Sequence, residues 1–283
     1  MKTSFYFYGN PYQPRSAEAA RKLAKAVEKR GGTVYAEQWL AEDGVGQGRG
    51  IEDMPEGIGA MVVFGGDGTL LRAAQAAVQR DLPLLGVHTG TVGFLMQGNA
   101  EDPETTAALL MEKDYPIVTY PLLEIRYDGR RYLALNDLAL TRGEHPGVIE
   151  VNAFADGEEV FRAHGDGVVV STPLGATAYG LSAGGPIVRH DAQCLMMTPL
   201  CARELLLRPV ILPLTAKITL NVQGRERRRL QLAIDGQTLL PVTHEAEISI
   251  ALASARIRMI LPGPPHFFDT LREKQAIWNQ QDR

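Results

Sequence analysis

The stretch AMVVFGGDGTLLRAAQAAVQR at residues 60–80 decides the fold. It begins with an apolar run of strand length, Ala60 to Phe64, passes through a glycine turn, and continues with a helical pattern from Leu70 to Arg80. A buried strand that leads through glycines into a helix is typical of an open α/β sheet. Such sheets bind ligands beyond the carboxyl ends of their strands, so we expect the glycine turn to lie at a binding site.

The segments around this stretch also alternate between strand and helix. The patterns predict strands at Thr3–Tyr8, Thr33–Ala36 and Leu84–Val87, helices at Ser16–Arg30 and Ala107–Lys113, and a mobile glycine-rich loop at Gly44–Gly50. This alternation predicts a parallel sheet covered by helices on both faces.

From Ile117 onward the chain changes to short alternating segments separated by turn pairs, which is typical of an antiparallel β domain. The predicted strands are Leu122–Tyr127, Tyr132–Thr141, Val148–Ala155, Val168–Ser171, Lys217–Val222 and Glu247–Leu252, and the turn pairs are Asp128-Gly129, Asp156-Gly157 and Asp235-Gly236. We therefore predict an α/β domain at residues 1–115 and a β domain at residues 116–263. Residues 264–283, which include the helical pattern Phe267–Trp278, are expected to pack back on the first domain.

Composition and charge exclude several classes of protein. The 283 residues are 45% hydrophobic and 22% charged, with a formal net charge of -4, so no basic surface for nucleic acid is expected. The basic run Arg225–Arg229 is interpreted as a solvated hairpin tip. No signal peptide and no apolar run of roughly 18 residues is evident, so we expect a cytoplasmic protein with no membrane partner. Cys194 and Cys201 lack the spacing of a metal site.

The turn Gly65-Gly66-Asp67-Gly68-Thr69 carries the first functional signal. Glycines let backbone amides approach phosphate oxygens, and the following helix adds the positive end of its dipole. The pattern matches neither G-x-x-x-x-G-K-[ST] nor G-x-G-x-x-G. Because an aspartate repels phosphate, we expect Asp67 to face an acceptor hydroxyl and take its proton; the alternative is an ordinary Asp-Gly turn.

The second signal is the stretch STPLGATAYGLSAGGP at residues 171–186, which suits a wall where backbone passes close to a planar ligand. Tyr179 could lie against a base, and Thr177 and Ser182 could donate hydrogen bonds; a structural loop is the alternative. The pair Asn136-Asp137 interrupts an apolar run, where it needs partners from the protein core or from a ligand.

Together, in this order, these segments resemble the NAD kinase family over nearly the whole chain. The motifs that carry the resemblance are the Gly65–Thr69 turn, Gly86–Leu95, Asn136-Asp137, Asp166-Gly167, Thr172–Val188 and Asp235-Gly236-Gln237. Diacylglycerol kinases, sphingosine kinases and phosphofructokinases have a similar glycine-aspartate turn, whereas the Thr172–Val188 stretch is far more specific.

The resemblance implies an α/β domain with a parallel sheet, followed by an all-β, sandwich-like domain, and the transfer of a phosphoryl group from ATP or polyphosphate to NAD. Asp67 would be the catalytic residue, and the donor phosphates, accompanied by Mg²⁺, would lie over Gly65, Gly66, Gly68 and Thr69. A homo-oligomer, either dimer or tetramer, is also implied. The residues implied in NAD binding are Asp67, Gly68, Arg72, Asn136, Asp137, His164, Asp166, Thr177, Ala178, Tyr179, Gly180, Leu181, Ser182 and Gln237.

The chain departs from the family pattern at several positions. Leu174, Ala176 and Gly180 stand where hydroxyl residues are frequent, His88 replaces a common asparagine, and Arg203 replaces a frequent histidine. Two other functions compete with an NAD kinase: a related kinase that acts on a lipid or sugar, and a sensor that binds NAD without catalysis. A dehydrogenase is disfavoured, since no G-x-G-x-x-G follows the first strand.

Overall fold

The computed structural model describes residues 3–90, 93–113, 115–144, 147–223, 230–243, 245–263 and 266–281. The helices are α1 (Pro14–Lys29), α2 (Gln38–Glu42), α3 (Asp67–Gln79), α4 (Pro103–Glu112), the 3-10 helix η1 (Gly175–Thr177), α5 (Tyr179–Ser182) and α6 (Phe267–Gln281). The strands are β1 (Ser4–Gly9), β2 (Thr33–Ala36), β3 (Gln47–Gly48), β4 (Ile58–Gly65), β5 (Leu84–His88), β6 (Gly98–Asn99), β7 (Ile117–Tyr127), β8 (Arg130–Ala134), β9 (Asp137–Thr141), β10 (Ile149–Ala155), β11 (Glu158–Gly165), β12 (Gly167–Ser171), β13 (Cys194–Leu200), β14 (Val210–Pro213), β15 (Ile218–Gln223), β16 (Leu230–Ile234), β17 (Thr238–Val242) and β18 (Glu247–Ile260).

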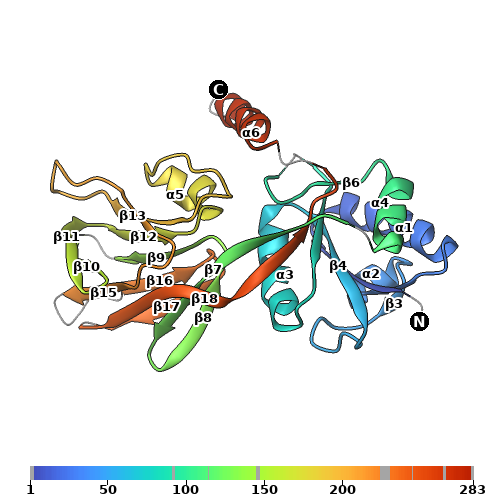
Figure 1. The fold of residues 1–283 in the computed structure, drawn as a ribbon, viewed down its shortest axis with the longest axis horizontal. Helices are drawn as coiled ribbons and strands as arrows, with labels where there is room; N and C mark the ends of the chain where they lie inside the picture. Colours follow the sequence, from blue (N-terminus) through green and yellow to red (C-terminus); the bar gives the residue numbers. More distant parts are fainter. Residues whose placement is uncertain are drawn as a thin grey trace. The chain divides into compact units, whose positions relative to one another are not determined.

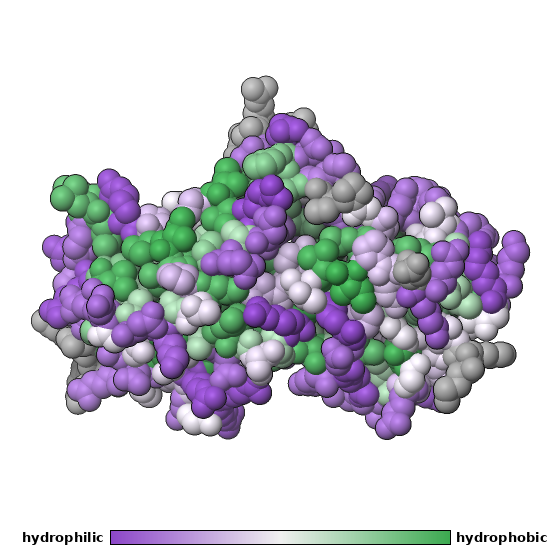
Figure 2. All heavy atoms as spheres, in the orientation of Figure 1, coloured by the Kyte–Doolittle hydropathy of each residue, from purple (hydrophilic) through white to green (hydrophobic). Residues whose placement is uncertain are grey.

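The chain forms two compact units, the first from Met1–Thr119 with Ile257–Arg283 and the second from Tyr120–Arg256. Hydrophilic residues, purple in Figure 2, cover much of the face drawn there, with smaller green areas of hydrophobic residues between them. None of the helices in the described ranges combines the length and the apolar character that a membrane crossing requires. The predicted hairpin tip at Arg225–Arg229 lies outside the described residues.

The first unit is built on a parallel sheet, as the sequence predicts. Its strands follow the order β5-β4-β1-β2-β3, and the end of β18 pairs with β5 in parallel (Figure 1). Successive strand residues alternate between faces, and one face contributes Phe5, Phe7, Val62 and Phe64 to a core with apolar residues of α1 and α4. α3 lies on the opposite face, because a Cβ atom added to Gly86 would stand 3.1 Å from Leu70 Cδ1.

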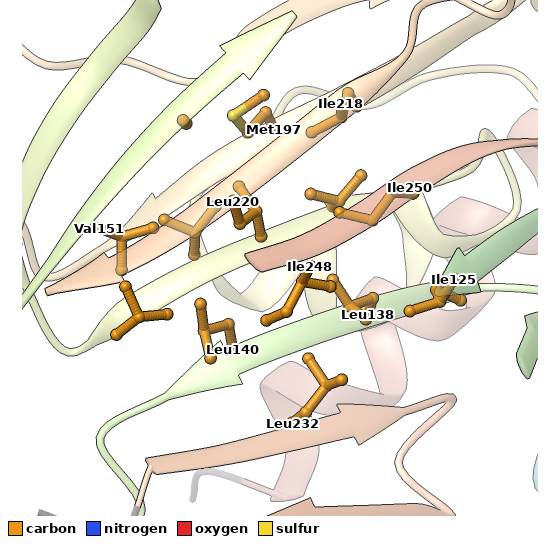
Figure 3. Packing of buried hydrophobic residues seen from close by; sticks show 14 of the residues in the cluster. Ile125, Leu138, Leu140, Val151, Met197, Ile218, Leu220, Leu232, Ile248 and Ile250 are labelled. Atoms are coloured by element: carbon orange, nitrogen blue, oxygen red, sulfur yellow. The ribbon is translucent and has the colours of Figure 1, made fainter. Parts of the chain in front are cut away.

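The second unit is an antiparallel sandwich, which confirms the predicted fold class. One sheet has the order β14-β13-β12-β9-β16-β17, and the other contains β11, β10, β15 and β18 in that order, with β7 paired to β18 and β8. Side chains from both sheets meet in one apolar core, shown in Figure 3. Leu140 of β9, Leu220 of β15 and Ile248 of β18 are fully buried there.

The predicted Asp-Gly turns are confirmed as tight hairpins. Asp128, Asp156 and Asp235 have φ values of 50°, 52° and 50°, and the glycine after each also has a positive φ. Two successive residues with positive φ match the twist of the strands that they connect, which is why Asp-Gly is favoured in such turns.

Several boundaries differ from those predicted. The strand predicted at Tyr132–Thr141 is wrong as a single element, because it is broken between β8 and β9 at Leu135 and Asn136. The loop at Gly44–Gly50 is also wrong in part, because Val45 is fully buried and β3 lies within this segment. α3 begins at Asp67, three residues before the apolar pattern starts. The elements that the pattern did not predict are α2, η1, α5, β3, β6, β11, β13, β14 and β17.

Candidate active site

The glycine turn after β4 leaves room for a ligand at its backbone. Gly65 has a φ of +152°, and a Cβ atom there would stand 2.6 Å from Thr69 Oγ1, so only glycine fits. Gly66 and Gly68 differ, since a Cβ atom at either would meet no heavy atom within 4 Å. Protein packing therefore does not require these two glycines, but a ligand that approaches the backbone closely would.

Asp67 is the first residue of α3, and the segment after β5 fixes its carboxylate. Phe94 donates its backbone N–H to Oδ2 and Leu95 donates its own to Oδ1, both at 3.2 Å. Gly93 allows this approach, because a Cβ atom there would stand 2.2 Å from Asp67 Oδ1. The glycine in this segment thus shapes the surroundings of the predicted catalytic carboxylate.

A lysine side chain that the sequence did not predict at this site lies beside the Asp67 carboxylate. Lys274 of α6 places its Nζ atom 2.8 Å from Asp67 Oδ2, and the two side chains are 21% and 26% exposed. The two residues are 207 positions apart in the sequence, which explains why spacing gave no indication of this contact. The helical pattern of the last segment was the only trace of this contact.

Arg72, a predicted NAD ligand, lies on the outer side of the first turns of α3. Its Nη2 atom donates to Thr69 Oγ1 at 3.3 Å, and its guanidinium is close enough to Tyr8 to affect the pKa of that hydroxyl. Burial raises the pKa of Tyr8, the charge of Glu37 adds to this rise, and Arg72 opposes it. Arg72 is therefore held beside the glycine turn, where its charge could reach an anion.

This group combines features that suit phosphoryl transfer to a hydroxyl. The 13-residue helix α3 directs the positive end of its dipole at the turn, which favours an anion there. Asp67 offers a fixed carboxylate that could accept a proton. In the described part of the chain, no three His, Cys, Asp or Glu side chains gather as metal ligands.

In the second unit, the loop at Leu135–Asp137 is held by one carboxylate. Asp235 accepts the backbone N–H groups of Leu135, Asn136 and Asp137 at 2.8, 2.7 and 3.1 Å. Its own N–H returns a bond to the Asp137 carbonyl at 2.9 Å. The partners of these three backbone N–H groups therefore come from the β16–β17 hairpin, and the sequence did not predict this role for Asp235.

Asp137 itself is an unusual carboxyl group, only 5% exposed. Burial, together with the negative charge of Asp235, raises the pKa of Asp137 to about 7, although a hydrogen bond from the Tyr179 backbone opposes the rise. Burial raises the pKa of Asp235 as well, against three backbone hydrogen bonds that favour its charged form. Perturbed carboxyl groups of this kind are frequent at binding sites, but they also occur in structural networks.

The predicted ligand wall runs against this loop. A Cβ atom at Gly175 would stand 2.1 Å from the Asn136 carbonyl oxygen, so glycine is needed for the close approach. η1 and α5 follow, and Tyr179 remains 41% exposed. Thr172 secures the contact by donating its hydroxyl to the Leu135 carbonyl at 2.6 Å. The structure thus brings Asn136, Asp137 and Tyr179 together.

Other residues of the wall have different surroundings. The Thr177 hydroxyl donates to the Leu174 carbonyl at 3.0 Å and lies 3.2 Å from His190 Nε2. Gly180 is buried, Ala178 and Leu181 are half-buried, and Ser182 is exposed. Leu174 and Ala176, which replace family hydroxyl residues, are 3% and 1% exposed. These two side chains therefore belong to the interior.

The other three predicted NAD ligands make no hydrogen bond to the Leu135–Asp137 loop among the described residues. His164 of β11 has its Nδ1 atom 2.7 Å from Glu204 and its Nε2 atom 3.4 Å from Glu150. Asp166 accepts the Arg142 Nε–H at 2.8 Å and is close enough to Tyr179 to raise the pKa of the Tyr179 hydroxyl, although burial is the larger cause. Gln237 is exposed in the β16–β17 turn.

Both units match one family. Residues 5–115 match the ATP-NAD kinase N-terminal domain, and residues 135–261 match the ATP-NAD kinase C-terminal domain. The chain is 34% identical to the NAD kinase of Heliobacterium modesticaldum over 271 residues, which cover 94% of this chain and 95% of the relative. It is 33% identical to the NAD kinase of Porphyromonas gingivalis, with 96% of each chain covered.

Solved structures share the fold. Yeast NADH kinase, complexed with NADH, matches with a TM-score of 0.85 at 23% identity, over 97% of this chain and 88% of the yeast chain. An NAD kinase from Archaeoglobus fulgidus, in complex with ATP, matches with a TM-score of 0.77 at 24% identity, over 96% of this chain and 99% of the other. On the sequence matches across both domains, the chain belongs to the NAD kinase family.

Proposed function

We propose that this protein transfers the terminal phosphoryl group of ATP to the 2′-hydroxyl of the adenosine ribose of NAD, and that Asp67 activates that hydroxyl. The observation that carries the assignment is the fixed Asp67 carboxylate, held by the Phe94 and Leu95 amides beside glycines that face open space. A carboxylate at the start of a helix, next to free backbone amides, can serve a hydroxyl and a phosphate at one place.

In the proposed reaction, the ribose oxygen attacks the terminal phosphorus of ATP. The bond from that phosphorus to the bridging oxygen breaks, ADP leaves, and Asp67 takes the hydroxyl proton. Because the transition state of phosphoryl transfer is loose, positioning and charge neutralisation supply most of the rate. Gly65, Gly66, Gly68 and Thr69 would line the donor phosphates, with Arg72 nearby; the Thr69 N–H itself donates to the Gly66 carbonyl at 2.9 Å, so the backbone N–H groups of the three glycines would do the binding. Mg²⁺ belongs to the substrate, since it arrives on the triphosphate.

The acceptor would be held by the second unit, Tyr120–Arg256, and the donor phosphates by the first, so the two units would have different roles. Asn136 and Asp137 would bind the adenosine part of NAD, because their loop is rigidly held and bordered by the exposed Tyr179 ring. Residues Thr177 to Ser182 would form the wall against the nucleotide. His164, Asp166 and Gln237 would contact other parts of the dinucleotide.

The proposal includes a homo-oligomer and a cytoplasmic location. The loop after β13 exposes Leu205 and Leu206 to 86% and 90%, which is typical of a surface that another chain covers. Light scattering after size-exclusion chromatography would measure the oligomer, and a monomer at all concentrations would contradict it. Cys194 and Cys201 are free thiols, as is usual in a reducing compartment. Cell fractionation would test the location.

The decisive experiment is NADP formation from NAD, ATP and Mg²⁺, read through an NADP-specific dehydrogenase. Asp67→Asn keeps the size of the side chain but removes the base, so activity should fall by at least about 10²-fold. Asp43→Asn is the matched control, because Asp43 pairs with Arg21 at the surface and its side chain is 51% exposed. If Asp67→Asn stays within a few-fold of wild type, Asp67 is not the base. NAD binding without any turnover would instead indicate a sensor.

A further inference from the structure

The pair between Lys274 and Asp67 resolves an electrostatic problem in the glycine turn. A carboxylate beside backbone amides that bind a triphosphate would repel it, because like charges at this distance oppose each other. The Lys274 ammonium, 2.8 Å from Asp67 Oδ2, offsets that negative charge. Both side chains are about three-quarters covered, so solvent screens this pair less than a fully exposed one.

Aromatic contacts fix the position of Lys274. The Phe267 ring packs on the Phe94 ring with centroids 5.6 Å apart, and Lys274 Nζ lies 4.7 Å from the Phe94 centroid. Phe267 and Lys274 are seven residues apart on α6, so they lie on one face of the helix. Phe94 is also the residue whose N–H binds Asp67, so one residue anchors both partners of the ion pair.

The contacts also decide which oxygen of Asp67 can serve a substrate. Oδ2 accepts both the Phe94 N–H and Lys274, whereas Oδ1 accepts only the Leu95 N–H among the described residues. A carboxylate offers roughly two acceptor directions on each oxygen. The remaining direction is therefore on Oδ1, and Lys274 makes the two oxygens of the carboxylate unequal.

We propose that Lys274 is a positioning residue for phosphoryl transfer. Its charge neutralises Asp67, so that the ATP phosphates can approach the Gly65–Gly68 turn, and its contact with Oδ2 leaves Oδ1 to the acceptor hydroxyl. This inference rests on the proposed function of the same site. It assigns the C-terminal helix to the catalytic apparatus of the first unit.

The test separates the effect of the Lys274 charge from the role of the side chain in attaching α6 to the rest of the first unit. Lys274→Gln keeps a hydrogen-bond donor but removes the charge, and Lys274→Arg keeps the charge. We expect Lys274→Gln to raise KM for ATP about tenfold and to lower kcat, and Lys274→Arg to restore most of both. Arg272→Gln is the matched control, since it removes one positive charge from the same helix, where Arg272 pairs with Asp269 at the surface. It should leave both constants unchanged.

Wild-type values for Lys274→Gln would overturn the inference, because Lys274 would then only tether the helix. Equal losses for Lys274→Gln and Arg272→Gln would overturn it as well, because the effect would then be one of overall charge. If wild type itself makes no NADP, the proposed function fails, and calorimetry with ATP and Mg²⁺ still decides the role of Lys274. Equal ATP affinities of wild type and Lys274→Gln would then refute it, and weaker binding to Lys274→Gln would support it.

Discussion

The substitution Gly93→Ala tests how firmly catalysis depends on the placement of Asp67. The added Cβ atom would stand 2.2 Å from Oδ1, 2.8 Å from Cγ and 3.0 Å from Oδ2 of Asp67. Carbon and oxygen atoms approach each other to about 3.3 Å, so the carboxylate must withdraw by about 1 Å. That shift breaks or lengthens its hydrogen bonds to the Phe94 and Leu95 amides.

A displacement of about 1 Å at a reacting group costs on the order of 10²-fold in rate, or roughly 3 kcal/mol of transition-state stabilisation. We therefore expect kcat for NADP formation to fall about 10²-fold in Gly93→Ala. The unfolding temperature should change little, because Asp67 is partly exposed and can move.

Gly90→Ala is the matched control, since it makes the same change in the same segment where a Cβ atom meets nothing within 4 Å. It should keep kcat within about twofold, in line with surface substitutions of small energetic effect. A Gly93→Ala enzyme with wild-type kcat would refute the reasoning, because Asp67 would then act without a fixed position. Equal losses in both variants would show that the segment tolerates no added carbon.

Three further predictions concern the second unit. Asp235→Ala removes the acceptor of three backbone N–H groups, so urea unfolding should show that the free energy of unfolding falls by an amount on the order of 3–5 kcal/mol. A decrease of less than about 1 kcal/mol would mean that water replaces the carboxylate. The pKa of Asp137 is raised to about 7, so its contribution to the free energy of unfolding is present below about pH 4 and is lost as the pH rises to 7. The stability of Asp137→Asn relative to wild type should therefore increase by up to roughly 4 kcal/mol between pH 4 and pH 8. A difference that stays constant over this range would contradict the raised pKa. Leu140→Ala opens a cavity at a fully buried position and should cost about 3 kcal/mol, whereas Leu239→Ala, at a position 57% exposed, should cost under about 1 kcal/mol in the same thermal unfolding series.

The local part of the fold follows from the sequence. The β4 strand, its glycine turn and α3 depend on neighbouring residues, so apolar runs and glycines suffice to predict them. The Asp-Gly hairpins are predictable for the same reason, because the turn type is set by two residues. α3 begins earlier than its apolar pattern, since Asp67 at the helix start is polar and contributes nothing to that pattern.

What the sequence could not predict depends on contacts between distant segments. The break between β8 and β9 exists because Asp235, about 100 positions later, binds the three amides there. Lys274 has an ordinary place in a helical pattern, and only the docking of Phe267 on Phe94 brings it to Asp67. The roles of the individual NAD and phosphate ligands stay predictions, which the substitutions above would test.

The long-range hold of Asp235 on the Leu135–Asp137 loop has a consequence for the newborn chain. While the ribosome extends the polypeptide through the intervening segment, those amides have no carboxylate to bind, since Asp235 is added 100 positions after Leu135. Contacts between residues so far apart form late, after the long connecting loop has closed. The loop should therefore reach its final shape only after translation has passed the β16–β17 hairpin, and chains that stop before Asp235 should leave the amides of Leu135, Asn136 and Asp137 without this acceptor.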